Sequence, residues 1–150
     1  MRTILKRGLL GLAALALAGP ALAQADVDTT PNGRKLTATL TGGAEVPGPG
    51  DANGGGVFDG RVNPGTGRLC YTLTVANLDE PTMAHIHIGK AGVAGDAAVT
   101  LDNPEDGRSE ECQDIDKALA QALVRDPSAY YVNVHTTEFP NGAVRGQLTK

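Results

Sequence analysis

The chain has 150 residues, a formal net charge of −4 and no tryptophan. This length suits one ordinary domain with enough residues for a real core. Seventeen acidic side chains outnumber thirteen basic ones, and the basic residues do not gather into a cluster that could follow a phosphate backbone. The composition therefore argues against a nucleic acid or an anionic membrane surface as the partner.

The first residues have the pattern of an export signal. Three basic residues among the first seven precede an uncharged apolar stretch over residues 8–18. Pro20-Ala21-Leu22-Ala23 then offers small residues at the spacing that a signal peptidase accepts, so the sequence predicts a signal peptide over residues 1–23, cleaved after Ala23. The apolar stretch is shorter than the about 20 residues that span a bilayer. We therefore expect a periplasmic or secreted protein without a membrane span.

Residues 24–34 are polar and lack periodicity, so we interpret them as a flexible leader before a single domain over residues 35–150. Within the domain, short segments alternate apolar and polar side chains, as half-buried strands do. These segments are 36–41, 57–62, 68–75, 83–88, 97–101, 130–135 and 143–148. The Pro- and Gly-containing turn over residues 63–67 joins the second and third segments and predicts a hairpin.

One segment has helical periodicity instead. From Ile115 to Arg125 the apolar side chains recur at helical spacing, with Asp114 as the candidate N-cap and Pro127 as the stop. Short strands, many glycine-containing turns and a single helix predict an all-β fold. The expected form is an antiparallel β-sandwich, Greek-key or immunoglobulin-like, with one short helix.

Cys70 and Cys112 are the two cysteines of the chain. A matched pair in an exported protein favours a disulfide. In the chain-entropy view, closing a loop of this length stabilises the folded state by roughly 4 kcal/mol. The alternative is a pair of thiols that bind a metal ion, and the sequence leaves it open.

Four blocks of the sequence resemble one known family. AHIHIGKAGVAGDAAVTL (84–101) and YYVNVHTTEFPNGAVRGQL (130–148) are similar to the two signature blocks of the CHRD domain, a module of chordin that also occurs in bacterial exported proteins. LTGGAEVPGP (40–49) resembles its opening block, and GRLCYTLTVANL (67–78) resembles its second strand pair. The resemblance implies an extracellular β-rich module whose biochemical role is poorly defined.

The resemblance also carries over individual residues. His85, His87 and His135 occupy the histidine positions of the signature blocks. Glu45 and Arg145 match the glutamate of EVP and the arginine of RGQ. A bidentate arginine–carboxylate pair between Glu45 and Arg145 could tie the opening loop to the last strand as a structural ion pair. The alternative is two independent surface charges.

The histidines suggest a metal site. Side chains two residues apart on a strand point to the same face, so His85 and His87 share a face opposite the apolar Ile86. His135 follows the same alternation on its own strand. If the two strands are neighbours, three imidazoles can bind one ion and leave a fourth position open, a set of ligands that suits copper, zinc or nickel. The alternative is a solvated or hydrogen-bonded face without a metal.

Three functions follow from these patterns. The leading hypothesis is a non-enzymatic binding module that holds a copper or zinc ion through the three histidines. The second is a metal-free module that binds a cell-envelope or extracellular protein. A metal-dependent enzyme ranks third, because neither Asp96 nor Glu138 stands in a recognisable motif for the general base of a hydrolytic site. Met83 could add a thioether ligand, although a core position is commoner for methionine.

Overall fold

The computed structural model describes residues 33–150. The predicted signal peptide and residues 24–32 of the predicted leader lie outside the described residues. Arg34, the last residue of that leader, is already part of a strand. In chain order the elements are β1 (Arg34–Thr41), η1 (Gly42–Ala44), β2 (Gly55–Val62), β3 (Arg68–Ala76), β4 (Pro81–Ile88), β5 (Ala97–Leu101), β6 (Arg108–Asp114), α1 (Lys117–Arg125), η2 (Pro127–Ala129), β7 (Tyr130–Thr136) and β8 (Val144–Gln147).

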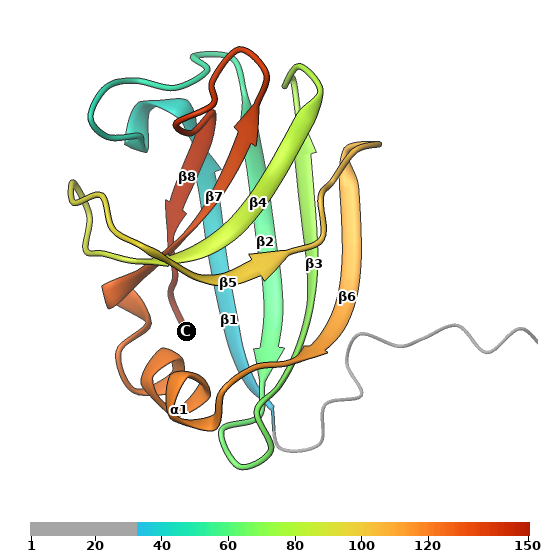
Figure 1. Ribbon diagram of the computed structural model, residues 1–150, viewed down its shortest axis with the longest axis vertical. Helices are drawn as coiled ribbons and strands as arrows, with labels where there is room; N and C mark the ends of the chain where they lie inside the picture. Colours follow the sequence, from blue (N-terminus) through green and yellow to red (C-terminus); the bar gives the residue numbers. More distant parts are fainter. Residues whose placement is uncertain (1–32) are drawn as a thin grey trace, which may run out of the picture.

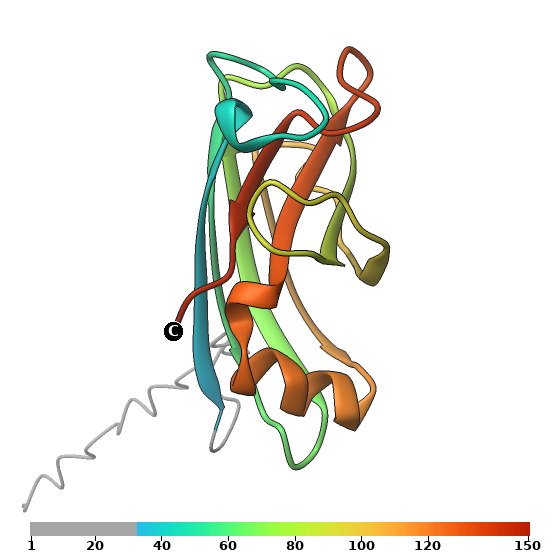
Figure 2. The same ribbon diagram turned by 90° about the vertical axis from the view of Figure 1, so that its left-hand side faces the viewer.

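All eight strands of the described part belong to one antiparallel sheet with the order β5-β4-β7-β8-β1-β2-β3-β6. The sheet curls so that its two ends approach each other and enclose the core, as Figure 1 and Figure 2 show. The expectation of an antiparallel all-β fold with one short helix is confirmed. The finer expectation of a Greek-key or immunoglobulin-like sandwich is not confirmed, because the strands form one continuous sheet that is nearly closed like a barrel.

The two halves of the sheet meet where β8 lies beside β1. In the strand ladder this seam has a single register pair, Thr41 with Arg145, and an isolated bridge between Thr37 and Thr149 extends it. A Cβ atom at Gly146 would collide with the carbonyl oxygen of Thr39, so the close approach of the two strands requires glycine there. We call β1, β2, β3 and β6 the first half of the sheet, and β4, β5, β7 and β8 the second half.

The core lies between the two halves and is made by the alternating apolar residues. Phe58 and Tyr71 stack in it with ring centroids 5.5 Å apart. The buried apolar side chains come from both halves and from α1, and they include Leu36, Leu40, Phe58, Val62, Leu69, Leu73, Ile86, Leu123, Val132, Val134 and Leu148. The period-two pattern of the sequence therefore identifies the buried faces of the strands correctly.

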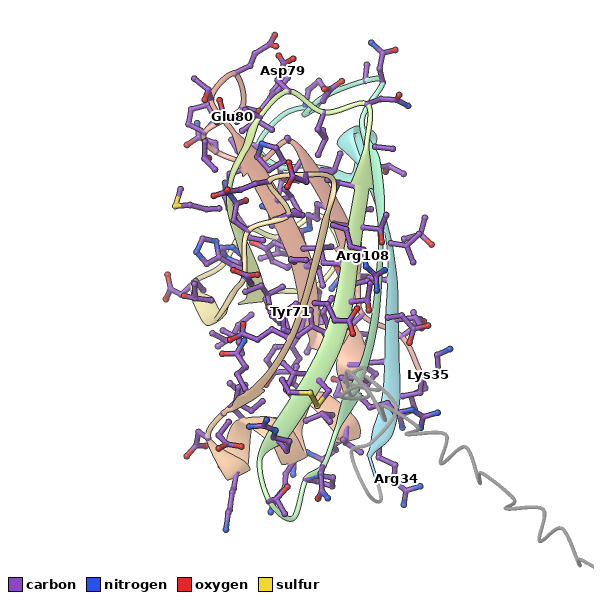
Figure 3. The ribbon with its side chains drawn as sticks, turned by 90° about the vertical axis from the view of Figure 1, so that its right-hand side faces the viewer. Arg34, Lys35, Tyr71, Asp79, Glu80 and Arg108 are labelled. Carbon is purple, nitrogen blue, oxygen red and sulfur yellow. A yellow bond between two sulfur atoms is a disulfide. The ribbon has the colours of Figure 1, made fainter. Side chains whose placement is uncertain are left out.

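Strand β6 was not expected from the sequence, because its inward-facing side chains are polar. They bridge to the segment around β5 at the other end of the sheet. The Ser109 hydroxyl donates to the carbonyl of Asp102 over 2.8 Å, and the Gln113 amide donates to the carbonyl of Thr100 over 2.9 Å. The hydroxyl of Tyr71, labelled in Figure 3, accepts from the Asp102 amide and donates to Glu111. These side-chain hydrogen bonds therefore nearly close the sheet into a barrel, although its terminal strands β5 and β6 are not paired with each other.

The disulfide between Cys70 and Cys112 is present, as predicted. The two residues lie directly opposite each other on β3 and β6, at a sequence separation of 42. The sulfur–sulfur bond is visible in Figure 3. This excludes the alternative in which the two thiols bind a metal, and it fixes the edge strand β6 to its neighbour.

Helix α1 begins two residues later than the sequence suggested. Asp116, rather than Asp114, is the N-cap, and its carboxylate accepts the amide hydrogen of Leu119 over 3.0 Å. Asp114 is instead the last residue of β6 and pairs with Arg68. Pro127 follows the helix in η2 and ends it as expected. The helix lies at the end of the molecule opposite the loops that follow β1 and β7 (Figure 1).

Candidate metal centre

The candidate site occupies the outer face of β4, β7 and β8. Residues directly opposite each other on antiparallel neighbours share a face, so the register sorts the polar side chains into rows. One row is His85, Asn133 and Arg145. A second row is His87, Tyr131 and Gln147, and a third pairs Met83 with His135. The apolar residues between them point to the core, and the histidines therefore all lie on the outer side.

The three histidines come together, as the sequence predicted. Each of His85, His87 and His135 offers one ring nitrogen, and these nitrogens lie within 4.8 Å of one another. The ring centroids are 5.3, 5.3 and 6.1 Å apart, and His85 Nδ1 lies 3.3 Å from His135 Nε2. Two nitrogens bound to one tetrahedral ion at 2.0–2.1 Å stand about 3.4 Å apart. We call these three residues the histidine cluster.

Backbone carbonyls orient two rings of the cluster. His87 Nδ1 lies 2.9 Å from the carbonyl of Gly95, and His135 Nδ1 lies 3.1 Å from the carbonyl of Pro140. Because a carbonyl oxygen only accepts, Nδ1 carries the proton of each neutral ring and Nε2 keeps its lone pair. Metal-bound histidines are held in the same way, by a hydrogen bond from the ring nitrogen that does not bind the ion. His87 Nε2 is buried and has no hydrogen-bond partner within the described residues.

Burial favours the neutral form of the cluster. Desolvation lowers the pKa of His85 and of His135 below the ordinary 6.5. A positive charge on His87 would lower both pKa values further, whereas the hydrogen bond to Pro140 acts in the opposite direction on His135. Both imidazoles are thus neutral at neutral pH, which is the form that binds metal ions.

A stack of rings fixes His87 from the side. Its imidazole lies on the ring of Tyr131, with centroids 4.9 Å apart and planes 9° from parallel. The guanidinium of Arg145 also lies over Tyr131, 3.4 Å from the ring centroid, and donates to the carbonyls of Lys90 and Val93 over 2.9 Å each. The loop that follows β4 is therefore tied down over the outer face. Tyr131 lies four residues before His135 on β7 and so on the same face, but its stacking role was not predicted from the sequence.

Glu45 and Arg145 share this region and are both buried, with 6% and 2% of their surface exposed. The alternative of two independent surface charges is therefore excluded. Glu45 is approached by the Asn133 amide at 3.5 Å, while the hydrogen bonds of Arg145 go to backbone carbonyls and to Gln147. Burial raises the pKa of Glu45 to about 7, although the charge of Arg145 opposes the rise. The attraction between the charges of Arg145 and Glu45 lowers the pKa of Glu45. A direct bidentate hydrogen-bonded pair between the two side chains stays a prediction.

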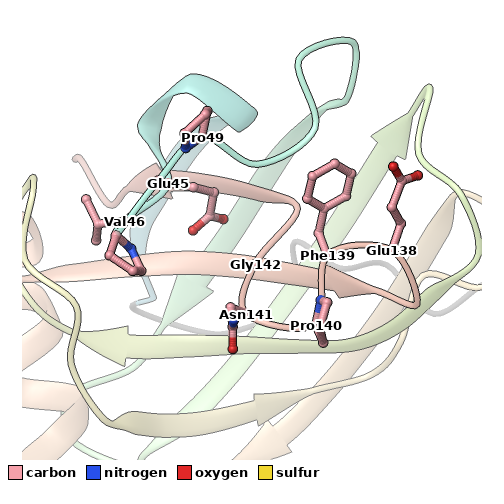
Figure 4. Close-up of a pocket in the computed structure, with 10 residues that line it drawn as sticks. Glu45, Val46, Pro49, Glu138, Phe139, Pro140, Asn141 and Gly142 are labelled. Atoms are coloured by element: carbon pink, nitrogen blue, oxygen red, sulfur yellow. The ribbon is translucent and has the colours of Figure 1, made fainter.

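A cleft of about 280 Å³ lies beside the cluster, between residues 45–49 and 138–142. Figure 4 shows Glu45, Val46 and Pro49 on one side and the loop from Glu138 to Gly142 on the other. Gly142 has a φ of 137°, and a Cβ atom there would collide with the Glu45 carboxylate, so this position requires glycine. The two loops are therefore packed closely against each other.

Neither carboxylate considered in the sequence joins the cluster. Among the described residues, the only group that could hold a metal ion consists of the three histidines, without Asp96 or Glu138. Glu138 lies instead with Asp79, and hydrogen bonding between the two carboxyl groups raises the pKa of Glu138. No helix within residues 33–150 is long and apolar enough to cross a membrane.

The family model of the CHRD domain matches residues 36–148, nearly all of the described chain. A search of curated proteins and a search of solved structures each found no match. The matched range contains the histidine cluster, Glu45 and Arg145.

Proposed function

This chain belongs to the CHRD domain family, and on that premise we propose that it is a non-enzymatic binding module that holds a transition metal ion, copper or zinc. The ligands are His85, His87 and His135. The observation that carries the proposal is the convergence of three imidazole nitrogens within 4.8 Å. The orientation of two rings by backbone carbonyls supports it further, because a proton on Nδ1 leaves a lone pair on each Nε2. The lone pair of His135 Nε2 accepts a hydrogen bond from His85 Nδ1 over 3.3 Å, and a bound ion would replace that hydrogen bond.

The proposed location is the periplasm or the extracellular space, after cleavage of residues 1–23. The Cys70–Cys112 disulfide supports this, since such bonds persist in oxidising compartments. In that compartment the ion would come from solution or from another carrier. The cluster suits such exchange, because His85 and His87 are only half-buried.

A second candidate is a metal-free module that binds a cell-envelope or extracellular protein. One observation favours it: Met83, Ile88 and Val93 are about half exposed, although they are large and apolar, and all three come from β4 and the loop after it. Large exposed apolar side chains are typical of protein-binding surfaces. If the chain is such a module, the histidines are part of the surface that contacts the partner protein.

A metal titration tests the first proposal. The purified chain is stripped with a chelator and titrated with Cu²⁺ or Zn²⁺ while its thermal unfolding and absorption spectrum are recorded. At a free metal concentration a hundredfold above the dissociation constant, binding should stabilise the folded state by about 2.7 kcal/mol. The gain should decline as the pH falls below 6.5, the ordinary imidazole pKa, because protons then compete with the ion.

Two variants make the titration specific. His87→Phe keeps a ring on Tyr131 but removes both nitrogens. It should weaken binding by more than the about 10–100-fold that is lost when a group that only orients a metal ligand is removed. Thr74→Ala changes an exposed side chain on β3, far from the cluster, and should bind like the wild-type chain. Failure of both metals to raise the unfolding temperature of the wild-type chain would contradict the proposal and leave the protein-binding module as the leading function.

A further inference from the structure

Met83 is not a core residue. It lies on β4, two residues before His85 and therefore on the same face, and it is directly opposite His135 on β7. Its side chain is 47% exposed, whereas the apolar residues of the inner face of β4, Ala84 and Ile86, are fully buried. A large thioether held at the surface beside three imidazoles does little for the stability of the core. Its position therefore calls for another explanation.

The thioether is within reach of the histidine cluster. Cβ atoms of directly opposite residues on antiparallel strands are about 4.5–5.5 Å apart, which is the relation between Met83 and His135. Same-face neighbours on one strand are about 6–7 Å apart, which is the relation between Met83 and His85. Methionine has three rotatable side-chain bonds and adapts to irregular space. Its sulfur atom can therefore approach an ion held between the rings.

The other approaches to the cluster are partly covered. The loop that carries Gly95 lies against His87, and the loop that carries Pro140 lies against His135. Tyr131 covers one face of the His87 ring. Met83, opposite His135, is an exposed neighbour of the cluster, and three imidazoles leave the fourth position of a tetrahedral site open.

We propose that the Met83 thioether is the fourth ligand of the site, and that the site takes Cu(I) in preference to Zn²⁺. The inference rests on the metal-binding function proposed above and narrows it. A thioether is a soft ligand that selects Cu(I), whereas imidazoles alone suit both Cu²⁺ and Zn²⁺. Cu(I) accepts a tetrahedral set of three nitrogens and one sulfur. The ion would be held at an exposed point, where another carrier can deliver or remove it.

Affinity measurements on the full chain test this inference. Cu(I) binding is measured without oxygen, with ascorbate as the reductant, by competition with bicinchoninate; Zn²⁺ binding is measured by competition with a chromophoric zinc chelator. Met83→Leu keeps the size of the side chain and removes the sulfur. It should lower Cu(I) affinity at least about tenfold and leave Zn²⁺ affinity within about twofold.

A second substitution tests the choice of metal in the opposite direction. Met83→His replaces the thioether by a fourth imidazole, and it should raise Zn²⁺ affinity while lowering Cu(I) affinity. X-ray absorption of the Cu(I)-loaded wild-type chain should show a sulfur neighbour that is absent in Met83→Leu. Unchanged thermal unfolding of the metal-free variants shows that each is folded, as expected for an exposed position.

The outcomes separate this inference from the function on which it rests. If the wild-type chain binds Cu(I) and Met83→Leu binds it equally well, Met83 is not a ligand, but the three-histidine site stands. If Met83→Leu weakens Zn²⁺ binding as much as Cu(I) binding, the selectivity is refuted. If the wild-type chain binds neither ion, both the proposed function and the inference are overturned.

Discussion

The outer faces of the two halves of the sheet differ in how deeply their polar side chains are buried. In the first half the outer face is solvated, and its ion pairs are exposed: Lys35 with Asp59, Arg68 with Asp114, and Arg108 with Glu110. In the second half the outer face carries Asn133, His135 and Arg145, all buried beneath loops. The inner faces of both halves are apolar, apart from the polar inward side chains of β6. The second half therefore buries polar side chains on its outer face, although the apolar core lies on the opposite face of the sheet.

This burial lowers stability and coincides with the candidate site. Four buried side-chain atoms in the described part have no hydrogen-bond partner, and three of them belong to Glu45, His87 and Asn133, on or over the outer face of the second half. A buried polar atom without a partner costs about 1–3 kcal/mol. Both halves supply the apolar core, and the second half also carries the groups that can bind a ligand.

The largest expected effect comes from the disulfide, which belongs to the first half. Replacing Cys70 and Cys112 together by alanine should lower the free energy of unfolding by about 2–4 kcal/mol, because the unfolded chain loses its cross-link. Urea unfolding measures the loss. Metal affinity should not change, since no histidine lies on β3 or β6. A parallel loss of metal affinity would show that the two halves do not act separately.

The next effect concerns Glu45 over the second half and depends on pH. Its pKa is about 7 in the folded chain against an ordinary value of 4.5, so the folded chain keeps a proton that the unfolded chain loses first. The resulting stability is fully present below pH 4.5 and disappears as the pH rises through 7; it is on the order of 3 kcal/mol at most.

Glu45→Gln has nearly the same shape and does not titrate. It should match the wild-type chain near pH 4.5 and be more stable by about 1–3 kcal/mol at pH 8. Unfolding curves of both chains across this range give the difference. Every other residue is the same in both chains, so the pH dependence that the other groups contribute cancels. A difference that does not vary with pH would show that the Glu45 carboxyl is not protonated in the folded chain.

The smallest effect is expected at the exposed pair of Lys35 and Asp59 in the first half, 3.0 Å apart. A double-mutant cycle with Lys35→Ala and Asp59→Ala should give a coupling of about 0.2–1 kcal/mol. Salt at about 1 M should remove most of it, because exposed charges are screened. A coupling as large as the effect of Glu45→Gln would contradict the contrast between a solvated and a buried outer face.

Alternation in the sequence predicted seven strands and the face of each histidine. It could not predict β6, whose inward residues are Ser109, Glu111 and Gln113, because a strand that faces the other edge of the sheet needs polar bridges rather than apolar packing. The helix cap was misplaced because Asp114 and Asp116 are equally good N-caps and only the end of β6 decides between them.

The candidate site could not be predicted from local alternation alone, because it depends on which strands are neighbours. His85 and His87 share a face by spacing alone, but His135 joins them only because β4 pairs with β7, two strands that are far apart in the chain. The position of Met83 opposite His135 depends on the register of that same pair. The seam at Gly146 joins the two halves into one sheet, and it depends on how closely the backbones of β1 and β8 approach each other. None of these contacts has a local sequence signal.

The side-chain bridges between the two ends of the sheet have a consequence for how copies of the chain meet. An open sheet presents unpaired backbone groups along its terminal strands, and these invite another strand to add and start aggregation. Here β5 and β6 are the terminal strands, and Ser109 and Gln113 occupy the carbonyls of Asp102 and Thr100. The near-closure that shapes the core thus also shields the chain from strand addition by its neighbours.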